Sequence, residues 1–175
     1  MCIRDSPSIN YDFGLVQVAE KQVNLEEVGG LVDAIPMEDF QQYMGVLDVD
    51  GSSWSSRFSS LLCQNSVVIK VEPEFVDYFH FDLKPWKHYI PVKRDLSDLA
   101  EAAAFVANPQ NDQRIKQIVQ AANEWCHTRM TASMLAEDLL HIWDAYVGEL
   151  NRHDPNWMEV WHNKKSTIKV DMRLE

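Results

Sequence analysis

The sequence predicts an α/β fold with a short parallel sheet and flanking helices, on three observations. The apolar run Met44–Val49 has the composition of a buried strand and ends in Asp50-Gly51. A helical pattern follows, and a second apolar run, Ser66–Val71, comes directly after it. Strand, loop, helix and strand in this order form a βαβ unit, whose two strands are parallel.

The helix of this unit is expected to begin at Ser55 or Ser56, because serine hydroxyls cap helix N-termini. The Asn65-Ser66 pair ends the helical pattern. The apolar face of the helix carries Phe58, Leu61 and Leu62.

The same periodicities assign the segments on either side of the unit. Before it we expect a strand at Tyr11–Val18 and a short helix at Pro36–Tyr43, since proline favours the first turn of a helix. After it we expect a helical turn at Glu72–Tyr78 and a strand at His88–Val92. Three further helices are expected, from Asp95 or Ser97 to about Ala107, over Ile115–Cys126, and from near Thr131 to Asn151.

No repeat, low-complexity tract or Gly/Ser linker divides the 175 residues, so we expect one continuous domain over residues 11–151. Residues 1–10 are expected to be a non-native or disordered start, because Met1–Ser6 matches neither a signal peptide nor a transit peptide. Residues 152–175 are expected to form a tail that packs back on the domain, with alternation at Thr167–Met172 that allows a strand.

Composition and charge exclude several classes of protein. No stretch approaches the roughly 20 apolar residues of a membrane-spanning helix, so we expect no transmembrane segment in this chain. The net charge of −11 repels a phosphate backbone, so nucleic acid is not an expected partner. Ten acidic and two basic residues fall within residues 1–50, so an anionic ligand is expected in the later part of the chain.

Cysteine and histidine give no redox or metal signature. Cys2, Cys63 and Cys126 form no C-x-x-C pair and leave an odd number for disulfides, so no cellular compartment follows from them. His80 and His88 lack the closely spaced cysteine, histidine or carboxylate partners of a zinc site. We therefore expect no bound metal ion.

The loop Asp50–Arg57, DGSSWSSR, is the most informative segment for function. Ligands of parallel α/β sheets bind at the carboxyl ends of the strands, where backbone N–H groups meet an anion. Gly51 allows a tight turn, and Arg57 can contact two phosphate oxygens at once. This arrangement suits a diphosphate, while helix capping beside a solvated arginine is the alternative interpretation. The residues expected at the phosphates are Gly51, Ser52, Ser53, Trp54, Ser55, Ser56 and Arg57.

Other enzyme classes lack their motifs. The chain contains neither a P-loop nor a G-x-G-x-x-G fingerprint, and no G-x-S-x-G elbow. Asp77, expected on a helix after the second strand of the unit, can accept hydrogen bonds from ribose hydroxyls. The carboxylates that could act as a general base, each expected at the surface, are Asp48, Asp50, Glu72, Glu74 and Asp77.

Two runs, LDVDGSSWSSRFSSLLCQNSVVIKV and EFVDYFHFDLKPWKHYIPVKRDLSDL, resemble the C-terminal, donor-binding half of glycosyltransferase family 90. This family includes the capsule-associated fungal transferases and the animal protein O-glucosyltransferases. The resemblance covers Val32–Asn151. It implies a GT-B enzyme of two Rossmann-like halves, with a UDP-sugar donor, no metal or other cofactor, and a place in the lumen of the endoplasmic reticulum or Golgi.

The resemblance also implies roles for individual residues. The loop Ser52–Arg57 would lie against the donor diphosphate, with Arg57 stabilising the leaving UDP, and Asp77 would stand where the family carries an acidic residue. The family's catalytic base and acceptor surface lie in the N-terminal half, so this chain is expected to be a fragment that is inactive alone.

The expected reaction is transfer of a hexose or pentose to a hydroxyl of a protein or glycan, with inversion. The first alternative is a non-catalytic sugar-nucleotide or carbohydrate-binding module with the same fold. A kinase-like or NAD-dependent α/β enzyme is the second, disfavoured because both glycine-rich fingerprints are absent.

Overall fold

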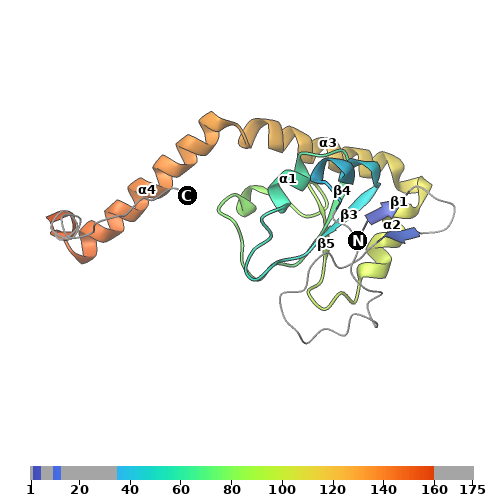
Figure 1. Ribbon diagram of the computed structural model, residues 1–175, viewed down its shortest axis with the longest axis horizontal. Coiled ribbons are helices and arrows are strands. Elements are labelled where there is room, and N and C mark those ends of the chain that lie inside the picture. Colours follow the sequence, from blue (N-terminus) through green and yellow to red (C-terminus); the bar gives the residue numbers. More distant parts are fainter. Residues whose placement is uncertain (1, 5–9, 13–34, 160–175) are drawn as a thin grey trace, which may run out of the picture. The chain divides into compact units, whose positions relative to one another are not determined.

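The structure, a computed structural model, describes residues 2–4, 10–12 and 35–159 (Figure 1). The chain divides into two compact units, Met1–Met130 and Thr131–Glu175. The strands are β1 (Cys2–Arg4), β2 (Asn10–Asp12), β3 (Gly45–Asp48), β4 (Val67–Val71) and β5 (Ile90–Val92). The helices are α1 (Phe58–Leu62), α2 (Leu99–Ala107), α3 (Asp112–Arg129) and α4 (Ala132–His153), with short 3-10 helices η1 (Met37–Gln42), η2 (His80–Asp82) and η3 (Pro109–Asn111).

The described strands form one sheet in the order β2-β1-β3-β4-β5. β3, β4 and β5 are parallel, whereas β1 runs antiparallel to both β2 and β3. Because α1 connects β3 to the parallel β4, the βαβ unit and the α/β class are confirmed. Residues 2–4 and 10 of the expected non-native or disordered start lie in strands, and the non-native origin of that start stays a prediction.

The core lies on both faces of β4, whose five residues are all buried. Val68 faces a cluster that includes the buried side chains of α1 and the C-terminal half of α3. Val67, Ile69 and Val71 face a second cluster, formed with α2 and the N-terminal half of α3. This alternation follows from the two-residue period of a strand, and it places Lys70 on the same face as Val68.

Several predicted elements are confirmed. η1 lies within the expected helix at Pro36–Tyr43, and β3 and β4 lie within the two apolar runs. α3 contains the predicted amphipathic stripe. α4 starts after Thr131, whose hydroxyl accepts a hydrogen bond from the N–H of Met134 at 3.3 Å.

Two helices begin later than the sequence predicted. The N-terminal residues assigned to α1 form part of the preceding loop, because the Ser55 hydroxyl bonds to Asp48 instead of capping the helix. α2 begins at Leu99, since the Asp98 carboxylate accepts a hydrogen bond from the N–H of Lys93 and leaves the helix uncapped by a side chain.

The predicted helical turn at Glu72–Tyr78 is wrong. Pro73 has no N–H to donate, and the N–H of Glu74 donates to the Asp50 carboxylate across the sheet edge at 2.9 Å. The chain therefore runs irregularly until η2, and Asp77 does not lie on a helix as expected.

The remaining expectations concern the ends of the chain. β2 ends at Asp12, so most of the strand expected at Tyr11–Val18 lies outside the described residues, as does Thr167–Met172. The domain limits 11–151 and the packing of the tail 152–175 stay predictions.

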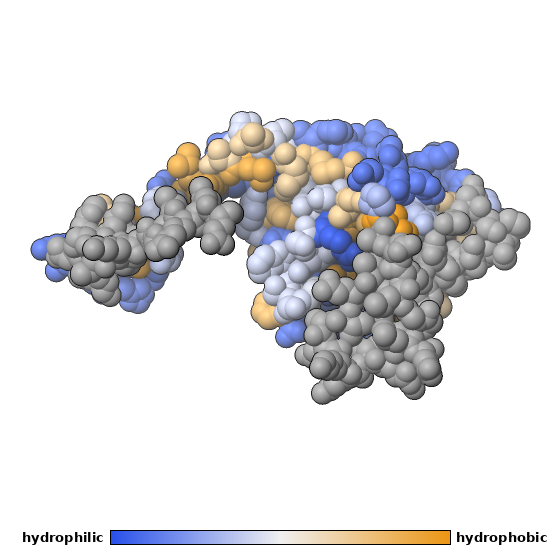
Figure 2. All heavy atoms as spheres, viewed as in Figure 1, coloured by the Kyte–Doolittle hydropathy of each residue, from blue (hydrophilic) through white to orange (hydrophobic). Residues whose placement is uncertain are grey.

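No described residue of α4 is buried, and Figure 2 shows apolar side chains on its surface. No helix in the described part of the chain could cross a membrane.

A disulfide joins Cys63, at the C-terminal end of α1, to Cys126 in α3, with their Cα atoms 5.4 Å apart. The sequence alone allowed three pairings of its three cysteines and indicated none of them. The bond fixes α1, and with it the end of the preceding loop, to the longest helix of the first unit.

Removing this bond should destabilise the protein, because 63 residues separate the two cysteines and the bond restrains them in the unfolded chain. We expect a Cys63→Ala/Cys126→Ala variant to lose about 2–4 kcal/mol in urea denaturation, and a Cys2→Ala control to lose far less. A non-reducing peptide digest in which the Cys63 and Cys126 peptides are not linked would contradict the pairing.

Gly45 lets α2 approach the sheet closely. A Cβ atom at this position would lie 3.2 Å from Cγ1 of Val106. We expect Gly45→Ala to lower the free energy of unfolding by about 1 kcal/mol, and Val106→Ala in the same chain to relieve part of this crowding. Gly51→Ala, whose Cβ would meet only the Trp54 carbonyl oxygen at 3.7 Å, is the matched control. Equal losses for the two alanines would refute the crowding.

Candidate functional site

The loop between β3 and α1 lies at the carboxyl end of β3, where the sequence placed the candidate site. Ser52, Trp54 and Ser56 are exposed in this loop, and Ser53 is partly exposed. The backbone of Gly51 lies outside the left-handed region, and a Cβ there would have ordinary contact distances. The loop's own geometry therefore does not require glycine at this position.

Asp48, the last residue of β3, is fully buried, so its expected surface position is wrong. Its Oδ1 accepts a hydrogen bond of 2.6 Å from the hydroxyl of Ser55, which is also buried. The guanidinium of Arg57 lies 3.5 Å from the same oxygen. One carboxylate thus contacts two residues of the candidate loop.

Lys70 on β4 stands beside Asp48, its register partner on the neighbouring strand. Its Nζ lies 2.9 Å from Asp48 Oδ2 and 2.8 Å from Asp50 Oδ1. The same ammonium is 5.2 Å from the centre of the Phe58 ring. The lysine side chain is only 3% exposed, so its positive charge is neutralised by the Asp48 and Asp50 carboxylates and is not available to solvent. We refer to Asp48, Asp50, Ser55, Arg57 and Lys70 together as the charged cluster.

Asp50 connects the charged cluster to the segment after β4. Its Oδ1 accepts from Lys70, and its Oδ2 accepts from the N–H of Glu74. Burial raises the pKa of this carboxyl, but the hydrogen bonds from Lys70 and Glu74 outweigh burial and hold the pKa below its usual value. Asp50 is therefore a structural anion at neutral pH.

Arg57 is the cation that the charged cluster presents to solvent, with 44% of its side chain exposed. Within the described residues its guanidinium donates no hydrogen bond, since the 3.5 Å contact with Asp48 is an ion pair only. This arginine therefore keeps donors available for an anion. The alternative interpretation, helix capping beside a solvated arginine, is half met: no side chain caps α1, whereas Arg57 is exposed as a solvated arginine would be.

Two hollows flank the carboxyl end of β4. One of about 190 Å³ includes Gly51, Ser52 and Ser53 in its wall, together with Arg94, which pairs with Glu74 at 3.2 Å. The other, of about 530 Å³, lies toward β5 and is lined in part by Lys70, His80 and Tyr89. Polar groups and space for a ligand therefore lie on both sides of the carboxyl end of β4.

Asp77 follows Val76, which lines the second hollow, and does not belong to the loop between β3 and α1. Burial raises the pKa of its carboxyl, with a further contribution from Asp50, while His80 and Lys70 act in the opposite direction. Burial and Lys70 lower the pKa of His80. No described contact joins the Asp77 side chain to residues 51–57, so its proposed contact with ribose stays a prediction.

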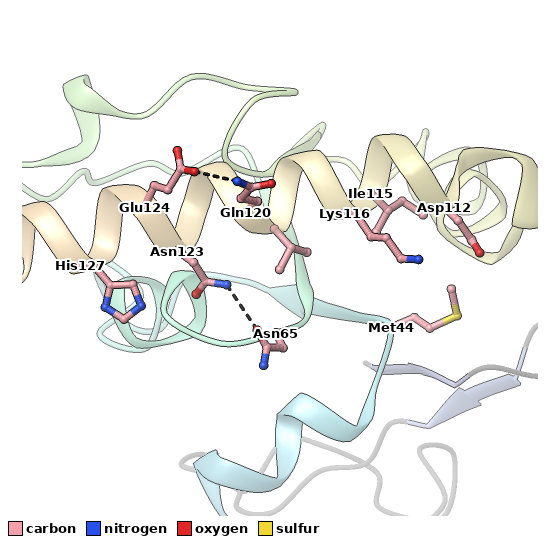
Figure 3. Close-up of a pocket in the computed structure, with 10 residues that line it drawn as sticks. Met44, Asn65, Asp112, Ile115, Lys116, Gln120, Asn123, Glu124 and His127 are labelled. Carbon is pink, nitrogen blue, oxygen red and sulfur yellow. Dashed lines mark hydrogen bonds between the residues drawn. The ribbon is translucent and has the colours of Figure 1, made fainter.

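A larger hollow, of about 830 Å³, lies at the other end of the strands (Figure 3). Met44 and Asn65, which precede β3 and β4, line it with one face of α3. Its polar groups are partly engaged with one another, as in the Asn123–Asn65 and Gln120–Glu124 hydrogen bonds. Its position at the amino ends of the strands separates it from the candidate site.

His88 makes a hydrogen bond within its own turn. Nδ1 of His88 accepts a hydrogen bond from the N–H of Lys84 at 2.9 Å. In the described ranges no group of three or more histidine, cysteine, aspartate or glutamate residues is placed to hold a metal ion.

Sequence reasoning missed the role of Lys70. A lysine within the apolar run Ser66–Val71 was the available signal, since a buried lysine needs a paired carboxylate. Two carboxylates, Asp48 and Asp50, occupied the neighbouring strand end in the sequence. Only the strand register and the path of the following loop show that both carboxylates contact the lysine.

The charge of Asp50 should make stability depend on pH in a defined direction. Because its folded-state pKa is held below 3.8, the ionised carboxylate stabilises the fold above that pH, and the effect is lost as pH falls through the folded pKa. We expect Asp50→Asn to be less stable than wild type in urea at pH 7, and the difference to shrink at pH 3. A difference that stays constant across this range would contradict the assignment.

The segments that form the fold and the candidate site match the sequences of known proteins. The sequence model of Glycosyl transferase family 90 matches residues 12–166. Protein O-glucosyltransferase 3 of Rattus norvegicus is 38% identical over 82 residues, which cover 47% of this chain and 16% of the rat protein.

Two other relatives match longer stretches. Protein O-glucosyltransferase 2 of Danio rerio is 34% identical over 102 residues, covering 58% of this chain and 20% of the fish protein. Protein O-glucosyltransferase 1 of Mus musculus is 37% identical over 116 residues, covering 65% of this chain and 28% of the mouse protein. The chain thus spans less than a third of the length of these relatives. Since the family model covers most of the chain, including the whole βαβ unit and the charged cluster, this chain belongs to glycosyl transferase family 90.

Proposed function

We propose that this chain is the donor-binding part of a glycosyltransferase of GT-B architecture, and that the loop between β3 and α1 binds the diphosphate of a UDP-sugar. The observation that carries the proposal is Arg57, a half-exposed guanidinium at the carboxyl end of a parallel strand with its hydrogen-bond donors available. Membership of a glycosyltransferase family supports the choice of substrate class.

The chemistry needed from this loop is stabilisation of a leaving group. When the bond between the sugar and UDP breaks, negative charge develops on the diphosphate. A preorganised donor aimed at such charge contributes about 2.7–4 kcal/mol to the transition state. In this proposal, such donors come from Arg57, from the N–H of Gly51 and from the accessible hydroxyls of Ser52, Ser53 and Ser56.

The charged cluster is electrically balanced before a donor binds. Lys70 and Arg57 oppose Asp48 and Asp50, so Arg57 is the cluster's accessible positive group and the cluster carries no excess charge. Further cations for the diphosphate are expected from the other half of the enzyme. This division agrees with a cleft in which both halves contact the donor.

The catalytic base and the acceptor site belong, in this proposal, to that other half. The parent enzyme would transfer a hexose or pentose to a hydroxyl of a protein or glycan, with inversion and without a metal ion. The relatives named O-glucosyltransferases support a sugar-to-hydroxyl reaction.

The secretory pathway is the proposed location, in the lumen of the endoplasmic reticulum or Golgi. The Cys63–Cys126 disulfide supports this location, because structural disulfides form and persist in oxidising compartments.

Arg57→Ala should weaken UDP binding to this chain by about tenfold or more, since hydrogen bonds to charged groups contribute about 1.5–3 kcal/mol. Calorimetric titration of both proteins with UDP measures the effect. Arg114→Ala is the matched control, because Arg114 is an exposed arginine whose guanidinium donates to the Trp86 carbonyl, away from the loop.

In the complete enzyme, the same Arg57→Ala change should lower the rate of sugar transfer by about 10²–10³. Unchanged UDP affinity and unchanged transfer in the variant would remove Arg57 from the donor site. Reduced UDP affinity with no transfer by the wild-type complete enzyme would favour the non-catalytic binding module instead.

A further inference from the structure

The strongest unassigned feature of the molecule is the buried pair Asp48 and Lys70 beneath the candidate loop. Both side chains are almost wholly buried, at 0% and 3% exposure, so neither can reach a donor in solvent. Ionised groups removed from water are costly unless they are paired and hydrogen-bonded. The contacts of this pair link it to the candidate loop.

Asp48 contacts the loop at two points. Its Oδ1 accepts from Ser55 and lies 3.5 Å from the Arg57 guanidinium. The first contact fixes the loop backbone two residues before the arginine. The second attracts the guanidinium toward one position without occupying its hydrogen-bond donors.

Lys70 limits the attraction between the Asp48 carboxylate and the Arg57 guanidinium. If Asp48 faced Arg57 alone, the arginine would be drawn into a close pair and its N–H groups would be used by the carboxylate. The Lys70 ammonium, 2.9 Å from Asp48 Oδ2, supplies the nearer positive charge. Asp50 in turn holds Lys70 in place at 2.8 Å.

We infer that Asp48 and Lys70 are positioning residues for Arg57. The Asp48 carboxylate sets the position of the guanidinium, and the Lys70 ammonium leaves the N–H groups of that guanidinium free for the diphosphate. This inference rests on the proposed function, since it requires that Arg57 binds the donor. It adds two residues whose influence on the diphosphate passes through the arginine alone.

The decisive test is a double-mutant cycle on UDP affinity. Asp48→Asn keeps the size of the side chain, and thermal unfolding first establishes that the variant folds. We expect Asp48→Asn to weaken UDP binding about tenfold in the wild-type background and less than about twofold in an Arg57→Ala background. Uridine, which lacks phosphate, should bind the wild type and Asp48→Asn equally.

Two milder variants keep the test informative if Asp48→Asn unfolds. Ser55→Ala removes one hydroxyl and should weaken UDP binding by about threefold, again only when Arg57 is present. Lys70→Arg keeps the buried charge and should retain most of the affinity. Ser60→Ala, an exposed serine on α1, is the matched control and should change nothing.

The outcomes separate the two claims. Equal losses of UDP affinity with and without Arg57, or a parallel loss of uridine affinity, would show that Asp48 and Ser55 act only through general stability and would overturn the inference. Failure of the wild type to bind UDP, or an Arg57→Ala variant with wild-type affinity, would overturn the proposed function and the inference with it.

Discussion

The arrangement of this protein's candidate site depends on one buried ammonium group. Lys70 lies near the carboxyl end of β4, the central one of the three parallel strands, and all five residues of this strand are buried, so the lysine charge must be matched there. Asp48 is its register partner on β3, and Asp50 reaches the same ammonium from beyond the strand end. Removing one partner of such a buried pair typically costs about 3–5 kcal/mol. The pairing therefore restricts both strand register and loop position.

This constraint explains how a short loop of small residues acquires a defined shape. α1 has only five residues, and no side-chain cap fixes its start. The loop is instead tied to β3 by Ser55 and to β4 through Lys70, while the disulfide at Cys63 holds the far end of α1 against α3. Restraint at both ends suits a turn that binds a nucleotide-sugar. The N–H and O–H groups of such a turn are already in place, so they do not have to be ordered when the ligand binds.

The fold could largely be read from hydrophobic periodicity. The apolar runs at Met44–Val49 and Ser66–Val71 became β3 and β4, and the stripe from Ile115 to Cys126 became part of α3. Errors arose where a side chain competed with the backbone. The Glu74 N–H bonds to Asp50 instead of continuing a helical turn, and Ser55 bonds to Asp48 instead of capping α1.

The position of the candidate loop could be predicted from the sequence, whereas the buried residues beneath it could not. Loop composition and family resemblance indicated Arg57, which is exposed next to the carboxyl end of β3, and its contact with a diphosphate stays a prediction. The sequence placed Asp48 at the surface, because five carboxylates near the site looked equivalent without knowledge of strand register. The disulfide could not be predicted either, because Cys63 and Cys126 are distant in sequence. Only the packing of α1 against α3 brings them together.

A crystal structure of this chain with bound UDP would show whether the loop between β3 and α1 holds the diphosphate of the sugar donor. We expect phosphate oxygens within hydrogen-bond distance of the Arg57 guanidinium and of loop residues 51–56, with the ion pairs of Lys70 to Asp48 and Asp50 unbroken. UDP bound elsewhere, for example in the hollow between α3 and Asn65, with Arg57 still facing solvent, would contradict this proposal.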